Sequence, residues 1–234
     1  MSGVLEEDLN IIANSDFDFG RFQNKTFLVT GATGLVGSVF IKALSYANEK
    51  NKLNVTVLAV VRDEKKAEKI LGEYKDIGNI HYIVADIGKK LDVENKIDYI
   101  IHGASITASK MMVENPVGTI STAVNGTMNI LELARQKKPE RVIYLSSMEV
   151  YGTISTGDVS ESDMEYVDLT NVRSCYPESK RMCECLCNAY SSQYGINVVN
   201  ARLAQTFGPG ILDTENRVFA QFARSAINGT DIVL

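Results

Sequence analysis

The sequence has no long apolar run and no excess of positive charge, and these absences exclude several classes of protein. No apolar stretch approaches the ~20 residues that a helix needs to cross a bilayer. The 234 residues carry a formal net charge of −5, and no long run of Lys or Arg offers a surface for nucleic acid. The first eight residues are acidic where a secretory signal is basic. We therefore expect a cytoplasmic protein with a small-molecule partner, and neither a membrane nor a nucleic acid as partner.

Cysteine is scarce, and its arrangement argues against disulfide or metal chemistry. Three of the four cysteines form Cys183-Glu184-Cys185-Leu186-Cys187, which on a helix places Cys183 and Cys187 on one face and turns Cys185 away. A closed zinc site usually draws its ligands from separate turns, and disulfide frameworks belong to small secreted domains. We expect no metal site, and cysteines that pack as small helix residues in a reducing compartment.

From Lys25 onward, short β-rich runs alternate with helical patterns, which is typical of a parallel sheet with helices on both faces. The sequence therefore predicts an α/β fold, a Rossmann-like doubly wound sheet. The predicted strands are 26–30, 55–61, 80–84, 99–102, 142–145 and 197–201, and the predicted helices are 35–48, 63–74, 117–137 and 177–194, with a further helical stretch near 218–228. Residues 1–24 are expected to be an N-terminal extension that contains one short helix and packs on the domain or on a partner subunit.

A glycine-rich turn follows the first predicted strand. After Phe27-Leu28-Val29 comes Thr30-Gly31-Ala32-Thr33-Gly34-Leu35-Val36-Gly37, with the spacing G-x-x-G-x-x-G. Such a turn between a strand and a helix lets the backbone approach a pyrophosphate, whose charge then lies at the helix N-terminus. The spacing differs from the G-x-G-x-x-G of the ordinary Rossmann fingerprint. By itself it is also compatible with a glycine-rich loop that binds nothing.

A tyrosine and a lysine, Tyr176 and Lys180, stand at positions i and i+4 of a predicted helix far downstream and project from one face of it. An ammonium group placed there can lower the pKa of the phenol and hold a ribose hydroxyl. Ser146 and Ser147 come directly after the apolar run 142–145, at a predicted strand end. A glycine-rich turn, a serine pair and a Tyr-x-x-x-Lys motif in this order rarely coincide by accident.

Together these segments resemble the extended short-chain dehydrogenase/reductase family, and more closely its NAD(P)-dependent nucleotide-sugar epimerase and dehydratase branch. The segments that carry the resemblance are Gly31 to Gly37, Asp86-Ile87, His102-Gly103-Ala104-Ser105, Gly126-Thr127, Ser146 to Gly152, Tyr176 to Lys180, and Arg202 to Gly210. In the family a smaller substrate-binding lobe continues well past residue 234. We therefore expect 25–207 to be the NAD(P)-binding domain, 208–234 to be the beginning of that lobe, and the chain to be a fragment. The resemblance also implies a homodimer.

The resemblance implies a reversible oxidation of the C4 hydroxyl of a nucleotide-diphosphate sugar, with hydride transfer to nicotinamide. It makes Tyr176 the general base, Lys180 the ligand of the nicotinamide ribose, and Ser147 the group that hydrogen-bonds the reacting oxygen. Ser146 has a structural role at the strand end, and either serine could instead simply terminate the strand.

Four further positions concern the substrate and the support of the site. Gln205 stands where the family often has an Asn that contacts the nucleotide diphosphate, and Arg202 and Arg217 are candidates for binding substrate phosphates, although Arg217 is also compatible with an ordinary surface arginine. Ala123 replaces an Asn that usually supports the family's site through backbone and water contacts. This departure puts efficiency in doubt and leaves the assignment intact.

Glu149 bears on which reaction follows C4 oxidation. In the family's 4,6-dehydratases and nucleotide-sugar decarboxylases a glutamate stands at this position. A ketone at C4 makes the C5 proton acidic, and a carboxylate placed nearby can remove it. Met148 argues against elimination, because the closest dehydratases have an aspartate there that protonates the departing hydroxyl, and a thioether cannot donate a proton. The alternative that Glu149 only caps a helix or pairs with a surface cation stays open.

The cofactor is expected to be NAD or NADP, and the end of the second predicted strand favours NADP. Val61 occupies the tip where an NAD-selective site commonly has an acidic residue, and Arg62 follows, although Asp63 could still reach a 2′-hydroxyl. Asp86 is expected to face the adenine amino group, with Ile87 beside the ring. The cofactor-binding residues implied by the resemblance are Gly31, Thr33, Gly34, Leu35, Val36, Gly37, Arg62, Asp63, Asp86, Ile87, Gly103, Ala104, Ser105 and Lys180.

Two other functions stay open at this point. One is an NADPH-dependent carbonyl reductase of the same fold acting on a non-sugar substrate, because Val61-Arg62-Asp63 also resembles the plant-type flavonol reductases. The runs 149–152 and 207–210 favour the sugar branch instead. The other is a non-catalytic relative that senses NAD(P) and regulates a partner, and the combined presence of Ser147, Tyr176 and Lys180 argues against it.

Overall fold

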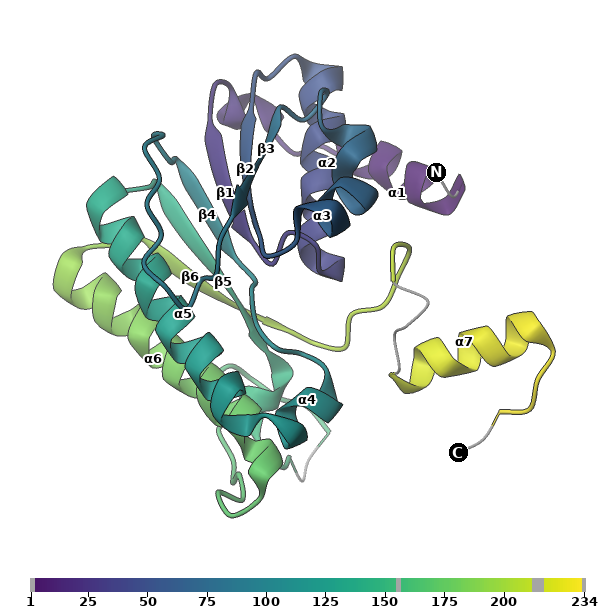
Figure 1. Cartoon of the computed structure of the whole chain (residues 1–234), viewed down its shortest axis with the longest axis vertical. Coiled ribbons are helices and arrows are strands. Elements are labelled where there is room, and N and C mark those ends of the chain that lie inside the picture. The colour runs from purple at the N-terminus through teal and green to yellow at the C-terminus, as the bar shows by residue number, and fades with distance from the viewer. Residues whose placement is uncertain (1–2, 155–156, 212–216, 233–234) are drawn as a thin grey trace.

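The computed structural model describes residues 3–154, 157–211 and 217–232, and a six-stranded parallel sheet forms its centre (Figure 1). The strands are β1 (Thr26–Thr30), β2 (Thr56–Val61), β3 (Ile80–Val84), β4 (Tyr99–His102), β5 (Arg141–Ser147) and β6 (Val198–Leu203). Their order is β3-β2-β1-β4-β5-β6, and all neighbours are parallel. The chain reverses its direction of winding between β1 and β4, where such sheets bind ligands at the carboxyl ends of their strands. The predicted doubly wound α/β fold is confirmed.

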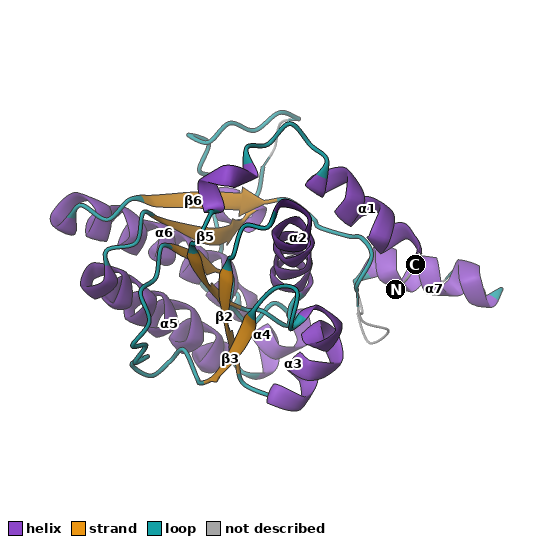
Figure 2. Cartoon of the chain, turned by 90° about the horizontal axis from the view of Figure 1, so that it is seen from above, coloured by secondary structure: helices purple, strands orange, loops and turns teal. Residues whose placement is uncertain are grey.

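Helices cover both faces of this sheet (Figure 2). One face carries α1 (Gly3–Ala13), α2 (Leu35–Asn51) and α3 (Glu64–Leu71), and the other carries α5 (Pro116–Lys137) and α6 (Cys175–Tyr194). The short α4 (Ser109–Glu114) precedes α5, and α7 (Val218–Asn228) stands apart from the layers (Figure 1). Four 3₁₀ turns complete the described elements: η1 (Phe19–Phe22), η2 (Gly72–Tyr74), η3 (Met148–Tyr151) and η4 (Val172–Ser174).

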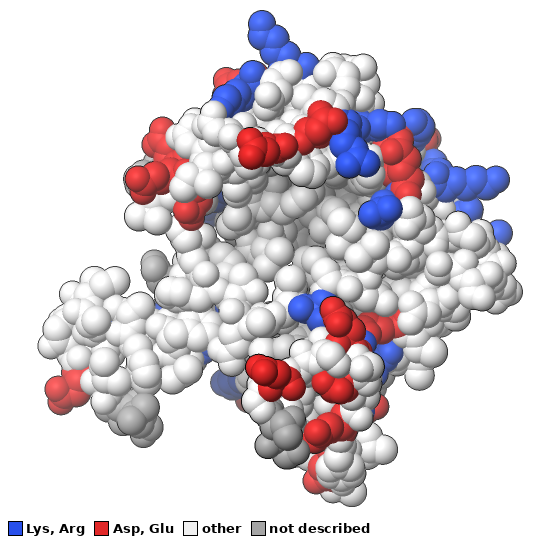
Figure 3. Space-filling view, turned by 180° about the vertical axis from the view of Figure 1, so that it is seen from behind, with Lys and Arg blue, Asp and Glu red and all other residues white. Residues whose placement is uncertain are grey.

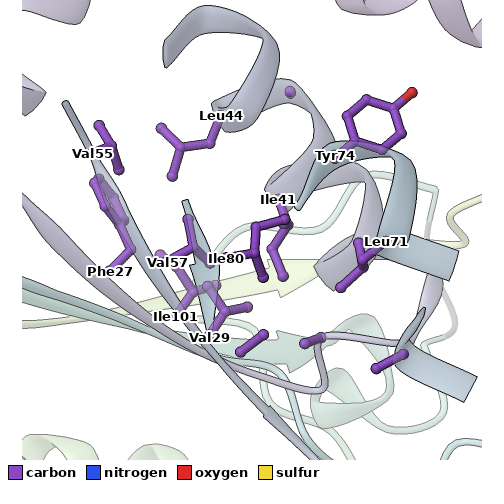
Figure 4. Close-up of a cluster of buried hydrophobic side chains, with 14 of the residues drawn as sticks. Phe27, Val29, Ile41, Leu44, Val55, Val57, Leu71, Tyr74, Ile80 and Ile101 are labelled. Carbon is purple, nitrogen blue, oxygen red and sulfur yellow. The ribbon is translucent and has the colours of Figure 1, made fainter. Parts of the chain in front are cut away.

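Alternate residues of the central strands divide between two cores. Because a parallel strand is covered on both faces, β1 and β2 are almost continuously buried. Phe27 and Val29 point toward α2, where they meet Ile41 and Leu44 (Figure 4). Leu28, from the opposite face of β1, belongs to the core beneath α5. The sheet edge that carries the candidate site is thus held from both sides.

The N-terminal helix belongs to the first of these cores. In α1 the residues Leu5, Leu9 and Ala13 are buried, at the i and i+4 spacing of one helix face. The hydroxyl of Tyr46 in α2 donates to Asn10 Oδ1 over 2.9 Å. The extension therefore contains a helix, as expected, and that helix packs on the domain.

Several boundaries differ from the predicted ones by a few residues, and two of them bear on the candidate site. Strand β5 includes Ser146 and Ser147, which pair with Arg202 and Leu203 of β6. The serines are therefore the last two residues of the strand, whereas the sequence predicted that they follow it. Helix α6 begins at Cys175, ahead of Pro177, since proline is tolerated in the first turn of a helix. The short α4 has no counterpart among the predicted helices. Within the described parts of the chain, no helix combines the length and the apolarity that a membrane span requires.

Candidate functional site

The glycine-rich turn connects β1 to the N-terminus of α2, and its geometry depends on glycine at two positions. Gly31 has φ +70°, and a Cβ there would lie 2.7 Å from the carbonyl carbon of Gly103. A Cβ on Gly37 would lie 2.3 Å from Gly31 O. Helix α2 begins after Gly34 with no side-chain cap, so its first backbone N–H groups have no side-chain acceptor. The turn is thus built for close backbone approach and for an anion at the helix N-terminus.

The loop after β4 lies against this turn. Ala104 N donates to Thr30 Oγ1 over 3.2 Å, and Gly103 N donates to Thr30 O over 3.2 Å. Within the described chain, Ser105 Oγ is buried without a hydrogen-bond partner. A buried hydroxyl without a partner is costly, and a ligand bound at this sheet edge would supply one.

Tyr176 and Lys180 of α6 meet Ser147 at the end of β5. Ser147 hydrogen-bonds the phenol of Tyr176. Lys180 Nζ donates to Leu145 O over 2.7 Å and lies 5.8 Å from the centre of the Tyr176 ring. The structure therefore brings together the three residues that the sequence assigns to proton transfer.

Burial governs the ionisation of this group. Burial lowers the pKa of Lys180 to about 8. Burial also raises the pKa of the Tyr176 phenol, and neither its hydrogen bond with Ser147 nor the positive charges of Arg173 and Arg217 fully offset this effect. In the protein alone, burial thus outweighs the ionising influence expected of Lys180, and the phenol is protonated at neutral pH.

Glu149 forms an ion pair that the sequence did not specify. Arg173 Nη1 donates to Glu149 Oε2 over 2.6 Å, and Arg173 Nη2 donates to Oε1 over 2.9 Å. About a third of each side chain is exposed, 34% for Glu149 and 37% for Arg173. The charge of Glu149 also acts on the pKa of Tyr176, so the pair lies beside the phenol. The carboxylate thus lies within the candidate site, and its cation partner is Arg173.

Arg202 has a structural contact in place of the phosphate-binding role considered from the sequence. Its guanidinium donates to both carboxylate oxygens of Glu184, at 2.8 Å from Nη2 to Oε2, and to Glu161 O over 2.7 Å. Ser146 Oγ donates to Glu184 Oε1 over 2.6 Å. Burial opposes ionisation, but these bonds hold the pKa of Glu184 below its ordinary value. Arg202 and Ser146 therefore bind Glu184 of α6 to the sheet.

The residues assigned to the adenosine half lie at the ends of β2 and β3. Arg62 is exposed, and Asp63 caps α3, accepting from Lys66 N over 3.0 Å. Asp86 is exposed and accepts from Gly88 N over 2.9 Å. Ile87 is buried against Gly126, where an added Cβ would lie 2.6 Å from Ile87 Cδ1. The side chain of Ile87 thus packs against α5.

The expected substrate-side residues follow β6. Gln205 is exposed in the loop after the strand. Arg217 Nη1 donates to Thr206 O over 3.3 Å, its guanidinium lies 5.0 Å from the ring centre of Phe219, and its charge reaches Tyr176. Arg217 therefore lies within electrostatic range of the phenol.

The cysteines take the predicted arrangement. Cys183 and Cys187 are buried in α6, and Cys185 is exposed. Among the described residues, no group of three or more His, Cys, Asp or Glu side chains is arranged to hold a metal ion.

The site fits a dinucleotide on several independent features. Gly31 leaves space that a Cβ would close, Ser105 Oγ lacks a partner, and the N-terminus of α2 is uncapped by side chains. The face of the molecule drawn in Figure 3 is hollowed between its two halves, and few charged side chains line the hollow. The fold and this turn define a dinucleotide-binding domain of the Rossmann type.

Comparison with known proteins specifies the family. The profile of the "NAD dependent epimerase/dehydratase family" matches residues 27–234. The chain therefore belongs to this family, as its motifs predicted.

Relatives of this chain are longer than it is. It is 34% identical over 206 residues to UDP-glucuronic acid decarboxylase 6 of Arabidopsis thaliana, covering 88% of this chain and 58% of that protein. It is 30% identical over 214 residues to UDP-N-acetyl-alpha-D-glucosaminuronate decarboxylase of Bacillus cytotoxicus, covering 90% and 64%. Among solved structures, an epimerase from Methanothermobacter thermautotrophicus superposes with a TM-score of 0.76 at 27% identity, covering 96% of this chain and 64% of that one. The chain thus spans less than two thirds of these relatives.

Two features of the site were missed by sequence reasoning. Arg173 stands three residues before Tyr176, in a turn whose geometry no local pattern specifies. His102 lies within the motif 102–105, and the motif assigns no role to its side chain. Both depend on contacts between distant segments.

Proposed function

We propose that this chain carries the cofactor site and the proton-transfer residues of an NAD(P)-dependent enzyme that oxidises the C4 hydroxyl of a nucleotide-diphosphate sugar. The carrying observation is the convergence of Tyr176, Ser147 and Lys180 at the carboxyl end of β5, on the sheet edge that bears the glycine-rich turn. Membership of the epimerase/dehydratase family supports the same conclusion.

The residues divide the first step among them. The bound nicotinamide supplies a hydride acceptor and later a hydride donor. Tyr176 takes the proton of the C4 hydroxyl, and Ser147 hydrogen-bonds the reacting oxygen and orients it toward the phenol. Because burial keeps the phenol protonated in the protein alone, Tyr176 becomes a base only where positive charge offsets burial. Arg173 and Arg217 already provide part of that charge.

For the step after oxidation, decarboxylation of a 4-keto uronic acid fits the residues better than elimination. Elimination needs an acid for the departing hydroxyl, and Met148 cannot be that acid. In a 4-keto uronic acid the C5–C6 bond breaks, its electron pair forms the C4–C5 enolate, and CO₂ leaves without an acid at that position. A proton from solvent, carried by Glu149, then adds to C5 of the enolate and gives the 4-keto pentose. The relatives named as UDP-glucuronic acid decarboxylases support this class of substrate.

The preference for NADP, the homodimer and the cytoplasmic location are finer parts of the same proposal. Arg62, exposed at the tip of β2, supports binding of the 2′-phosphate of NADP, and Asp63 is already engaged as a helix cap. A homodimer and a cytoplasmic location stay predictions.

Turnover assays on a substrate panel test the proposal. We expect conversion of UDP-uronic acids with release of CO₂, detected by mass spectrometry of the nucleotide-sugar product, and no reduction of simple ketones by NADPH. Tyr176→Phe should abolish conversion while leaving cofactor binding nearly unchanged, because the hydroxyl is the proton acceptor and adds little to the dinucleotide pocket. Reduction of simple ketones would favour the carbonyl reductase, and cofactor binding without any turnover would favour the sensor.

Glu149→Gln tests the second step separately, because it keeps the shape of the side chain and removes the group that carries the proton. Hydride transfer should persist, seen as reduced nicotinamide absorbance, while incorporation of solvent deuterium at C5 is lost. Glu178→Gln is the matched control, because Glu178 forms a comparable ion pair with Arg181 and is 36% exposed. Wild-type incorporation in the Glu149 variant would leave this residue with only its pairing to Arg173.

A further inference from the structure

A chain of buried polar side chains crosses the sheet edge beneath the candidate site. Thr30 Oγ1 lies 2.7 Å from His102 Nδ1, and His102 Nε2 lies 3.1 Å from Thr127 Oγ1. Thr127 Oγ1 lies 3.2 Å from Cys183 Sγ, which in turn lies 3.3 Å from Ala123 O. All four side chains are at most 2% exposed. None of them has a part in the proton-transfer steps described above.

The groups at the two ends of this series of hydrogen bonds fix the direction of every bond in it. Ala104 N–H donates to Thr30 Oγ1, so the Thr30 hydroxyl is free to donate to His102 Nδ1. The ring then carries its proton on Nε2 and donates to Thr127, Thr127 donates to Cys183, and the thiol donates to the carbonyl of Ala123. With the proton on Nδ1 instead, the Thr30 hydroxyl would have no acceptor among these partners. Only the Nε2–H tautomer satisfies every donor.

The ring is also neutral. Complete burial, with a smaller contribution from the charge of Lys180, lowers the pKa of His102 to about 3. The hydrogen bonds therefore keep one direction across the physiological range.

The hydrogen-bonded series joins two parts of the candidate site that are far apart in sequence. One end holds the backbone of Ala104, in the loop 103–105 that packs against Gly31. The other end is Cys183 of α6, at the i+3 position from Lys180 on the same helix. A dinucleotide bound across this edge would contact both the loop and Lys180, so the distance between them matters for its binding.

We propose that His102 is a positioning residue, which as its Nε2–H tautomer holds the loop 103–105 and the Lys180 turn of α6 at the spacing that the dinucleotide requires. This inference rests on the proposed function, because the spacing has a role only if both parts bind one cofactor. His102 acts through Thr30, Thr127 and Cys183, and it touches neither substrate nor cofactor.

The tautomer can be read directly, because the protein has only two histidines. Long-range ¹H–¹⁵N correlation spectra of the ¹⁵N-histidine-labelled 234-residue chain should show one ring as a fixed neutral Nε2–H tautomer from pH 7 to pH 5. The second ring belongs to exposed His81, and His81→Gln assigns its signals. A His102 ring with its proton on Nδ1, or one that titrates in this range, would overturn the proposal. This readout needs neither turnover nor cofactor.

A pair of buried cysteines separates positioning from plain stability. Cys183→Ala removes the last side chain of the hydrogen-bonded chain, whereas Cys187→Ala removes an equally buried thiol of the same cluster that makes no hydrogen bond to it. Both variants should lose similar stability. Only Cys183→Ala should weaken NAD⁺ binding, by about 5-fold, which corresponds to the loss of one hydrogen bond of ~1 kcal/mol. Cys183→Ser, which retains a donor and an acceptor, should restore most of the affinity.

Isothermal titration with NAD⁺, and with NADP⁺ in parallel, gives these affinities. Equal dissociation constants for the two alanine variants would refute the positioning role while leaving the proposed function intact. If the wild-type protein bound neither dinucleotide, the proposed function itself would fail. The tautomer measurement would still test the direction of the hydrogen bonds around His102.

Discussion

Replacing Lys180 with methionine should stabilise the protein while destroying its candidate site. The ammonium is buried, with 4% of the residue exposed, and its close partners are the carbonyl of Leu145 at 2.7 Å and the ring of Tyr144 at 4.8 Å. One carbonyl and an aromatic face compensate little of the hydration that the charge loses. Met has similar length, carries no charge and fits apolar surroundings.

The expected magnitude follows from the lowered pKa. A pKa reduced from 10.5 to about 8 means that the folded protein disfavours the charged form by roughly 3 kcal/mol relative to the unfolded chain. Loss of the donor to Leu145 O offsets about 1 kcal/mol of this. Lys180→Met should therefore raise the free energy of unfolding by roughly 2 kcal/mol at pH 7.

The gain should depend on pH in a defined direction. Below pH 8 the amine is charged in both states, so the wild type has its full destabilisation. Between pH 8 and 10.5 the unfolded chain binds more protons than the folded protein, so the wild type gains stability as pH rises. The advantage of Lys180→Met should therefore be largest at pH 7 and nearly gone by pH 10.

Urea unfolding at pH 7 and at pH 10 measures both quantities. Lys110→Met is the control, because Lys110 has an 81% exposed side chain and its replacement should change stability little at either pH. A Lys180 variant that is no more stable than wild type at pH 7, or whose advantage is as large at pH 10, would refute the reasoning.

Three other predictions concern the cofactor and the framework. Arg62→Ala should weaken NADP binding more than NAD binding, by about 1.5–3 kcal/mol for a charge-assisted contact, and equal changes by calorimetry would remove the basis for preferring NADP. Gly37→Ala, whose Cβ would lie 2.3 Å from Gly31 O, should lower the free energy of unfolding by roughly 1–3 kcal/mol and weaken dinucleotide binding, and a variant with wild-type values of both would contradict the close-approach argument. Glu184→Gln should cost roughly 3 kcal/mol at pH 7, because it leaves Arg202 without its carboxylate. Since the pKa of Glu184 is lowered, that contribution is present above pH 4.5 and fades as pH falls, so an equal cost at pH 3 and pH 7 in urea unfolding would contradict it.

The fold was predictable because its signals are local. The predicted strands 26–30, 80–84 and 99–102 match the observed bounds. The first and third are buried apolar runs, and 80–84 is a half-exposed edge strand of β-branched and aromatic residues. The end of β5 was not predictable, because Ser146 and Ser147 are polar and join the strand only by pairing with β6. A tertiary contact there extended a strand whose own pattern stops at Leu145.

The candidate site was predictable where a motif specifies it. Gly31, Ser147, Tyr176 and Lys180 lie at one sheet edge as their motifs indicated. The pairing of Glu149 with Arg173 was not predictable, because Arg173 lies in a turn that is defined by its neighbours in space.

Unused hydrogen-bonding capacity separates the functional charges from the structural ones in this fold. Arg202 lies against α6 and Lys180 belongs to it, and the sequence offered both as ligands of a bound molecule. The guanidinium of Arg202 has the carboxylate of Glu184 and the carbonyl of Glu161 as acceptors, so its burial is compensated within the protein. Among the described residues, Lys180 has three donors and one acceptor at hydrogen-bonding distance, and the buried hydroxyl of Ser105 has none. Buried groups that lack partners are retained where a ligand supplies them. By this criterion Arg202 belongs to the framework, and we propose the sheet edge that carries Ser105 and Lys180 as the cofactor site.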